Sequence, residues 1–190
     1  MLDKDWAYLR SSLDELQDYI LSDEVYWPLI ALPRNHGTGP LPSLTLGRLL
    51  LSRARLTAAE WAPEFQKDLD NICGIVDDVR KRWRAHWVHK ANQEFPRRLS
   101  LWHHYLRELH EDPNKWERDY AYQVERRVML QLLLAEMDHP REEDLAALSA
   151  LDHQLMAIVT ECEFLWDPRI EKGFPRRDYW FLYYHVVSEK

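Results

Sequence analysis

The apolar residues between Thr57 and Ala91 recur at alternating spacings of four and three, which keeps them on one face of an α-helix. This spacing predicts a long central helix that packs against a partner helix. We expect it to end near Asn92, because Pro96 follows and starts the next helix. Its start is open. Thr57–Glu60 has the pattern of a capping box, but Pro63 then requires either a single turn before a helix that begins there or a kink. The apolar stripe consists of Phe65, Leu69, Ile72, Val76, Val79 and Trp83.

Stripes of the same kind predict further helices on both sides of this one. Two helices precede it, over residues 3–22 and 44–55, and Ser43 is a candidate N-cap for the second. Three follow it, over residues 96–112, 114–137 and 142–165.

The helix predicted over residues 114–137 contains the almost wholly apolar run Val128–Ala135. Apolar residues on every side of two helical turns indicate burial on most sides, so this helix is expected to lie near the centre of the fold. A short turn at Asp138–Pro140 separates it from the helix over residues 142–165. The short connection predicts that these two helices form an antiparallel hairpin.

Two segments do not have a clear helical pattern. Residues 31–43 contain two glycines and three prolines, which is typical of a surface loop. Residues 174–190 form a tail that is rich in aromatic residues and is compatible with a helix or a strand. Because no other strand is predicted, we expect a helix that docks on the bundle or on a partner.

These elements predict an all-α fold: a single-domain antiparallel helical bundle of about five to seven helices over residues 1–190. The chain of 190 residues is long enough for one hydrophobic core and short for two. Its composition, 46% hydrophobic and 30% charged, is that of a globular protein and argues against disorder.

Charge and composition exclude several classes of protein. The net charge of −7 disfavours a general affinity for nucleic acid or for anionic membranes. No apolar run is long enough to span a membrane, and the first residues do not have the pattern of a signal peptide. Two cysteines, Cys73 and Cys162, are too few for a disulfide framework. We therefore expect a cytoplasmic protein with no membrane partner.

A basic segment runs from Arg80 to Arg98 and contains seven Lys or Arg residues but one acid, Glu94. Arginines interleaved with aromatic residues can bind phosphates and stack on bases. The segment is a candidate anion or nucleic-acid site, although cations near a helix C-terminus also complement the helix dipole and can pair with acids elsewhere. The candidate anion-binding residues are Arg80, Arg84, Arg97 and Arg98.

A second candidate site is a metal centre in the bundle. His86 continues the spacing of the central stripe, His103 flanks a stripe residue of the next helix, and Asp152 interrupts the stripe between Leu148 and Leu155. If these helices meet, two imidazoles and a carboxylate can bind a metal or act as acid and base. The alternative is a hydrogen-bonded polar cluster, or histidines at the edge of the core.

The aromatic tail is the third candidate, because Tyr, Trp and Arg dominate the energetics of protein interfaces. No nucleophile elbow, dinucleotide fingerprint or phosphate-binding loop is present, so no cofactor is expected. The leading hypothesis is a non-enzymatic interaction or assembly protein that binds a protein partner or itself, most simply as a homodimer. The two alternatives are a metal-dependent bundle enzyme and a nucleic-acid-binding module. The candidate interaction residues are Arg176, Arg177, Tyr179, Trp180, Tyr183 and Tyr184.

Overall fold

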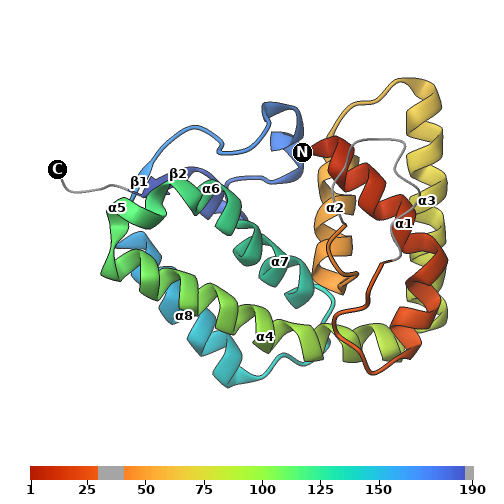
Figure 1. Ribbon diagram of the computed structural model, residues 1–190, viewed down its shortest axis with the longest axis horizontal. Coiled ribbons are helices and arrows are strands. Elements are labelled where there is room, and N and C mark those ends of the chain that lie inside the picture. Colours follow the sequence, from red (N-terminus) through yellow and green to blue (C-terminus); the bar gives the residue numbers. More distant parts are fainter. Residues whose placement is uncertain (30–40, 187–190) are drawn as a thin grey trace.

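The computed structural model describes residues 1–29 and 41–186, and in these residues six helices of ten or more residues carry the fold (Figure 1). They are α1 (Leu2–Leu21), α2 (Leu46–Ala58), α3 (Pro63–Arg82), α4 (Arg84–Glu111), α7 (Glu125–Leu134) and α8 (Glu142–Met156). The predicted all-α fold class is confirmed. The shorter elements are α5 (Pro113–Trp116), η1 (Glu117–Asp119), α6 (Tyr120–Gln123), β1 (Val159–Glu161), η2 (Pro168–Gly173), η3 (Trp180–Leu182) and β2 (Tyr184–Val186).

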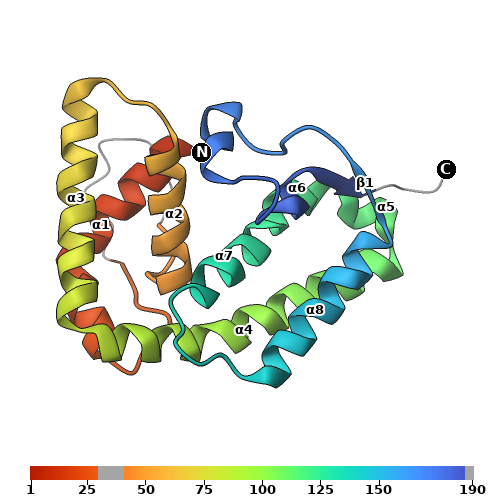
Figure 2. The ribbon, with the colours of Figure 1, turned by 180° about the vertical axis from the view of Figure 1, so that it is seen from behind.

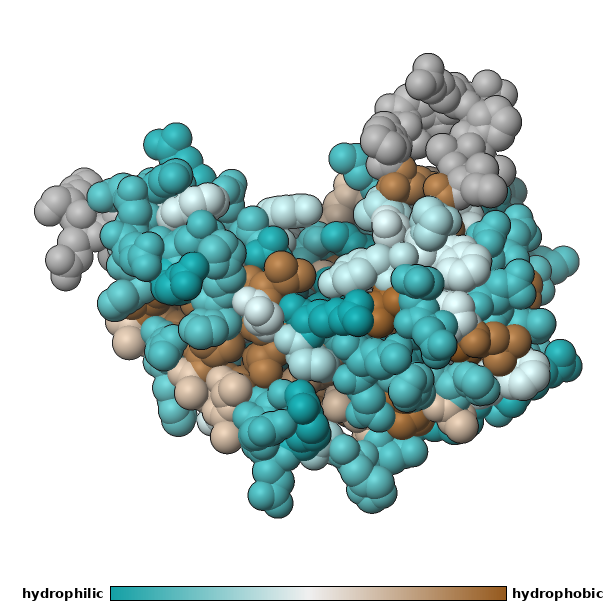
Figure 3. All heavy atoms as spheres, turned by 60° about the horizontal axis from the view of Figure 1, so that its bottom comes forward, coloured by the Kyte–Doolittle hydropathy of each residue, from teal (hydrophilic) through white to brown (hydrophobic). Residues whose placement is uncertain are grey.

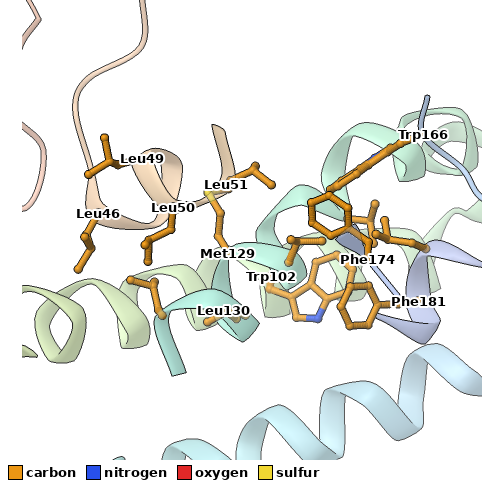
Figure 4. Packing of buried hydrophobic residues seen from close by; sticks show 14 of the residues in the cluster. Leu46, Leu49, Leu50, Leu51, Trp102, Met129, Leu130, Trp166, Phe174 and Phe181 are labelled. Atoms are coloured by element: carbon orange, nitrogen blue, oxygen red, sulfur yellow. The ribbon is translucent and has the colours of Figure 1, made fainter. Parts of the chain in front are cut away.

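Helix α7 lies between α2 and α4 and packs against both, as expected for a central apolar helix. Helices α1, α2 and α3 form one group, and α4 leads away from it with α8 behind it in Figure 1 and in front of it in Figure 2. One hydrophobic cluster includes residues of all six long helices. Figure 4 shows part of it, where Leu51 of α2 lies near Met129 of α7, and Trp102 of α4 lies beside Phe174 and Phe181 of the tail.

The predicted central helix over residues 57–91 is two helices. Thr57 belongs to the end of α2, and α3 begins at Pro63, one of the two starts that the sequence left open. Helix α3 then ends at Arg82, because Trp83 leaves the helical conformation with φ −116° and ψ 36°. Leu69, Ile72 and Val76 of the predicted stripe are buried, whereas Phe65 is exposed.

The predicted boundary at Pro96 is wrong, because α4 continues through this proline to Glu111. A proline inside a helix removes one backbone hydrogen bond. Buried side chains on both sides of it, including Trp87, Phe95 and Trp102, hold α4 together across that position. Tertiary packing therefore outweighs the local cost of the proline.

The second half of the chain is more broken than predicted. The residues expected to form one helix over 114–137 divide into α5, η1, α6 and α7, although Asp112 does cap α5 through the Lys115 N–H. The predicted hairpin is also wrong, because α8 packs mainly against α4. Helix α8 ends at Met156 and not at residue 165, as the sequence predicted. The N-cap of α2 is Thr45 and not Ser43.

The tail is not a helix. Its residues 184–186 form β2, which pairs antiparallel with β1, with Val159 opposite Val186 and Glu161 opposite Tyr184. The tail packs on its own chain through Val186, with Phe174 and Phe181 fully buried. The β1 strand was missed because its residues were assigned to the preceding helix. Of the predicted surface loop over residues 31–43, residues 31–40 lie outside the described residues, as do 187–190 of the tail. Within the described ranges, no helix has the length and apolar character needed to cross a membrane.

Candidate functional site

Helix α4 carries a buried polar stripe of three charged residues, Lys90, Glu94 and Arg98, spaced four apart. The Lys90 ammonium donates hydrogen bonds to the backbone carbonyls of Ser22 and Glu24, both at 2.7 Å, where α1 ends. A cation at this position complements the negative end of the α1 dipole. Burial lowers the pKa of Lys90. Both backbone groups that contact its ammonium are hydrogen-bond acceptors.

The next two residues of this buried polar stripe serve the start of α2. Glu94 accepts a hydrogen bond from the Gly47 N–H at 3.0 Å and another from the Arg98 guanidinium. Arg98 also donates to the Thr45 hydroxyl at 2.7 Å. A buried carboxylate therefore occupies the positive end of α2, the place where a helix otherwise binds an anionic ligand.

The other free N–H groups at the start of α2 are also satisfied by side chains of the protein. The hydroxyls of Tyr8 and Tyr19 accept from the N–H groups of Thr45 and Leu46, at 3.1 and 2.9 Å. The Thr45 hydroxyl accepts from the Arg48 N–H at 3.2 Å. Burial raises the pKa of both tyrosines, so they remain neutral phenols. This buried site serves the structure of the protein and is closed to an external ligand.

Arg80 and Arg84, two of the predicted anion-binding residues, are bound by a carboxylate of the same chain. Glu136 accepts from Arg80 Nε at 2.8 Å, from Arg84 Nη1 at 3.1 Å and from Trp87 Nε1 at 3.1 Å. Arg84 also pairs with Asp138 at 2.8 Å. With Arg98 held by Glu94, three of the four predicted arginines are therefore neutralised within the protein.

Arg97 differs from the other three. It is exposed, lies over the Tyr26 ring at 6.0 Å, and makes no ion pair with the described residues. Among the four predicted anion-binding residues, it is the one that no carboxylate of the described residues pairs with.

The structure does not bring His86, His103 and Asp152 together. His86 and His103 are exposed on α4, whereas Asp152 binds the buried Arg127 guanidinium through both oxygens, at 2.8 and 2.9 Å. Among residues 1–29 and 41–186, no three His, Cys, Asp or Glu side chains are placed to hold a metal ion. The predicted convergence is therefore wrong, because the carboxylate of α8 is used to neutralise an arginine of α7.

The candidate interaction residues of the tail are engaged with their own chain. Arg176 pairs with Glu161 at 2.6 Å and lies over the Tyr183 and Tyr184 rings, both at 5.7 Å. Arg177 pairs with Asp178 at 3.0 Å. Tyr183 is buried and donates to the Phe174 carbonyl, and Tyr179, Trp180 and Tyr184 are half-buried. The aromatic side chains of the tail therefore mainly pack against the hydrophobic core of the same chain.

A second buried charge cluster joins α1, α2 and α7. Arg55 contacts Glu125 at 2.7 Å and Asp5 at 3.7 Å, and lies over the Trp166 ring at 4.0 Å. Ser52 donates to Asp5 Oδ1 at 2.9 Å, while Asp5 Oδ2 has no hydrogen-bond partner. Burial raises the pKa of Asp5 more than Arg55 lowers it. The contacts of this buried cluster therefore hold α1, α2 and α7 together.

The outer surface of α4 carries a row of exposed cations and imidazoles, which we call the basic face. Its spacings of three, eight, seven and three residues place them on one side of the helix. Between Arg80 and Arg107 the chain has one acid, Glu94, and that residue is fully buried. Acids appear only at the helix end, where Glu108 and Glu111 lie 3.5 Å from His104 and 3.9 Å from Arg107. The basic face consists of His86, His89, Arg97, His104 and Arg107.

A mixed patch lies beside the basic face where α4 meets the α6–α7 segment. Arg126 is half-buried there and donates one hydrogen bond, to the Leu101 carbonyl at 3.3 Å. Leu101 is 41% exposed and Tyr122 is 63% exposed, which is unusual for such large side chains. We call Leu101, Tyr122 and Arg126 the Arg126 patch. Figure 3, which turns the α4 and α8 side forward, shows hydrophobic atoms set among a mostly hydrophilic surface.

Sequence reasoning identified part of this surface. The scarcity of acids from Arg80 to Arg98 was visible, but the continuation of the row to His104 and Arg107 was hidden by the predicted helix boundary at Pro96. The position of Arg126 had no sequence signal, because it depends on how α6 and α7 pack on α4.

Comparison with known proteins adds no assignment: no family model, no curated protein and no solved structure matches this chain.

Proposed function

We propose that this protein is a non-enzymatic interaction protein whose basic face on α4 binds an acidic segment of a protein partner. The observation that carries the proposal is the separation of charge on α4: its acid Glu94 is buried and its exposed outer side, through Arg107, presents only imidazoles, guanidiniums and uncharged groups. Complementary charge across an interface steers encounter and selects partners.

The rest of the protein supports this separation. The chain has a net charge of −7, and exposed cations elsewhere, such as Arg10 and Arg141, pair with acids of the same chain. Arg97 of the basic face lacks a carboxylate from the described part of the chain. The basic face runs from His86 to Arg107, which spans about 30 Å along the axis of α4.

A protein partner fits this surface better than a nucleic acid. Nucleic-acid binding depends on Lys and Arg contacts to phosphates, but three of the four arginines predicted for that role are held by Glu94 or Glu136. An interface with few permanent charges, interspersed with histidines, suits the less dense charge of an acidic protein segment. A second copy of this chain is the other protein that could occupy it.

A metal-dependent enzyme has less support. The buried carboxylates of Glu94 and Glu136 and the half-buried carboxylate of Asp152 each bind an arginine. We place the protein in the cytoplasm as part of the same proposal, and the two free cysteines, Cys73 and Cys162, are compatible with a reducing compartment.

The proposal is tested by measuring the binding of fluorescein-labelled poly-L-glutamate by anisotropy at low salt. We expect saturable binding that weakens as salt rises, because exposed charges are screened beyond about 10 Å at 0.1 M ionic strength. The variant Arg97→Gln/Arg107→Gln is expected to bind several-fold more weakly. A matched control, Lys67→Gln/Arg118→Gln, removes two exposed cations elsewhere and should bind like the wild type.

Two results would overturn the proposal. Equal loss of affinity in the control variant would mean that net charge alone governs binding. Tighter binding of a DNA duplex of equal charge would favour the nucleic-acid module instead. Native mass spectrometry tests the remaining candidate partner, a second copy of this chain. A wild-type dimer that is lost in the Arg97→Gln/Arg107→Gln variant would show that a second copy binds the basic face.

A further inference from the structure

Arg126 is a half-buried guanidinium that the fold does not neutralise. Among the described residues it makes no ion pair, and its hydrogen bond goes to a backbone carbonyl that already serves α4. The nearby charges do not compensate it: Arg98 repels it, and Glu108 pairs with His104. Desolvation accordingly lowers the pKa of Arg126, opposite to the effect of a carboxylate partner.

This environment contrasts with that of the other arginines packed between these helices. Arg55, Arg98 and Arg127 are each held by a carboxylate at hydrogen-bond distance. Partly removing a charge from water without a partner is costly, and a carboxylate from outside would restore the lost interaction. The guanidinium fork suits a carboxylate because it donates two parallel hydrogen bonds.

Two large side chains near Arg126, Leu101 and Tyr122, are accessible to solvent. Leu101 stands one helical turn beyond Arg97, so the Arg126 patch lies beside the basic face on α4. Tyr122 presents most of its ring to solvent. Tyr and Arg are enriched among the residues that dominate binding energy.

We propose that the Arg126 patch anchors the acidic partner segment, with Arg126 binding a carboxylate and Leu101 and Tyr122 contacting an adjacent apolar side chain. The inference rests on the proposed function and specifies its partner: an acidic segment in which a Glu or Asp lies beside a Leu, Ile or Phe. The basic face then binds the further acids of that segment, and the Arg126 patch supplies the apolar contact that charge alone lacks.

The probe for this inference is a synthetic helical peptide of glutamate and leucine, compared with one in which glutamine replaces glutamate and one in which serine replaces leucine. We expect the full peptide to bind most tightly and both substituted peptides to lose affinity. Arg126→Gln should weaken binding of the full peptide by about tenfold or more, as expected for the loss of a charge-assisted pair at an anchor. Arg126→Lys keeps the charge but not the guanidinium fork, so its affinity for the full peptide should lie between those of the wild type and Arg126→Gln.

The wild-type protein gives a measurement that does not depend on folding of a variant. In an NMR titration with the full peptide, the Nε–H signal of Arg126 should shift and saturate with the binding curve. The control for loss of one charge is Lys67→Gln, which removes an exposed cation of α3 and should leave peptide binding unchanged.

The outcomes distinguish the two proposals. Weaker binding by Arg97→Gln/Arg107→Gln with unchanged binding by Arg126→Gln would overturn the anchor and leave the basic face in place. Equal binding of the serine-substituted peptide would also overturn the anchor, since no apolar contact would be needed. Failure of the wild type to bind either poly-L-glutamate or the glutamate–leucine peptide would overturn both.

Discussion

Glu94 Oε2 on α4 accepts a hydrogen bond from the Gly47 N–H at the start of α2, at 3.0 Å, across 47 residues of sequence. The contact joins the two helices that enclose α7, and it places a negative charge at the positive end of the α2 dipole. Arg98 holds the other carboxylate oxygen. The buried polar stripe of α4 therefore helps to fix the position of α2 against α4.

Replacing Glu94 by glutamine should strongly destabilise the protein. The substitution leaves the Arg98 guanidinium buried without its carboxylate, which costs about 3 kcal/mol when a buried pair is broken. Urea unfolding followed by circular dichroism measures the change. Glu163→Gln, at an exposed carboxylate, should change stability by less than about 0.5 kcal/mol. Equal stability of the two variants would show that the buried pair is not needed.

Alanine substitutions at two glycines should have opposite effects. A Cβ at Gly47 would lie 2.8 Å from both Arg98 Nε and Glu94 Oε1, so Gly47→Ala should destabilise the protein by about 1–3 kcal/mol despite the higher helix propensity of alanine. A Cβ at Gly74 of α3 meets nothing within 4 Å, and Gly74→Ala should stabilise by up to about 1 kcal/mol. Thermal unfolding of both variants checks the sign, and stabilisation by Gly47→Ala would contradict the close packing of α2 on α4.

The raised pKa of Asp5 predicts a specific pH dependence. Because the folded state holds this proton more tightly than the unfolded state, the Asp5 contribution to stability falls as pH rises above about 3.8, the unperturbed value, through the raised folded pKa. Asp5→Asn removes this titration. The stability of wild type relative to Asp5→Asn should therefore be highest at acid pH and decrease towards neutral pH, as measured by urea unfolding at a series of pH values. A difference that stays constant or rises with pH would contradict the burial of Asp5.

Phe181→Ala should destabilise the protein by about 3–5 kcal/mol, because Phe181 is fully buried in the core and the Arg127 guanidinium lies 4.6 Å from its ring centre. Phe65→Ala, at a ring that is 49% exposed on α3, should cost less than about 1 kcal/mol.

Deletion of residues 174–190 should abolish cooperative unfolding, because it removes Phe181 and the other buried side chains of the tail from the core. A truncated chain that keeps a cooperative transition would mean that the tail is not part of the core.

The helices with a regular apolar stripe and a clear terminal signal were predictable. Residues 3–22 correspond closely to α1, and Asp112 and Asp167 cap short helices as their position before a proline predicts. These features depend on residues within a few positions of one another. The same holds for the apolar run of α7, whose burial follows from its composition alone.

The failures occurred where distant residues decide the outcome. Pro96 has a local cost that predicts a boundary, but Lys90, Glu94 and Arg98 bind α1 and α2 from both sides of it and keep α4 continuous. Strand β2 requires a partner, β1, that lies 25 residues earlier in the chain. The residues of β1 fall within the helix that the sequence predicts over residues 142–165.

The sequence by itself determined the fold class, the positions of the main apolar stripes and the scarcity of acids that marks the start of α4. The tertiary structure decided which charges remain available, because that depends on contacts between residues far apart in the chain. Arg80, Arg84 and Arg98 look alike in sequence to Arg97, yet Glu136 and Glu94 neutralise the first three and leave the fourth at the surface. A local pattern records that a residue is charged, but only the packed chain places, or fails to place, the opposite charge beside it.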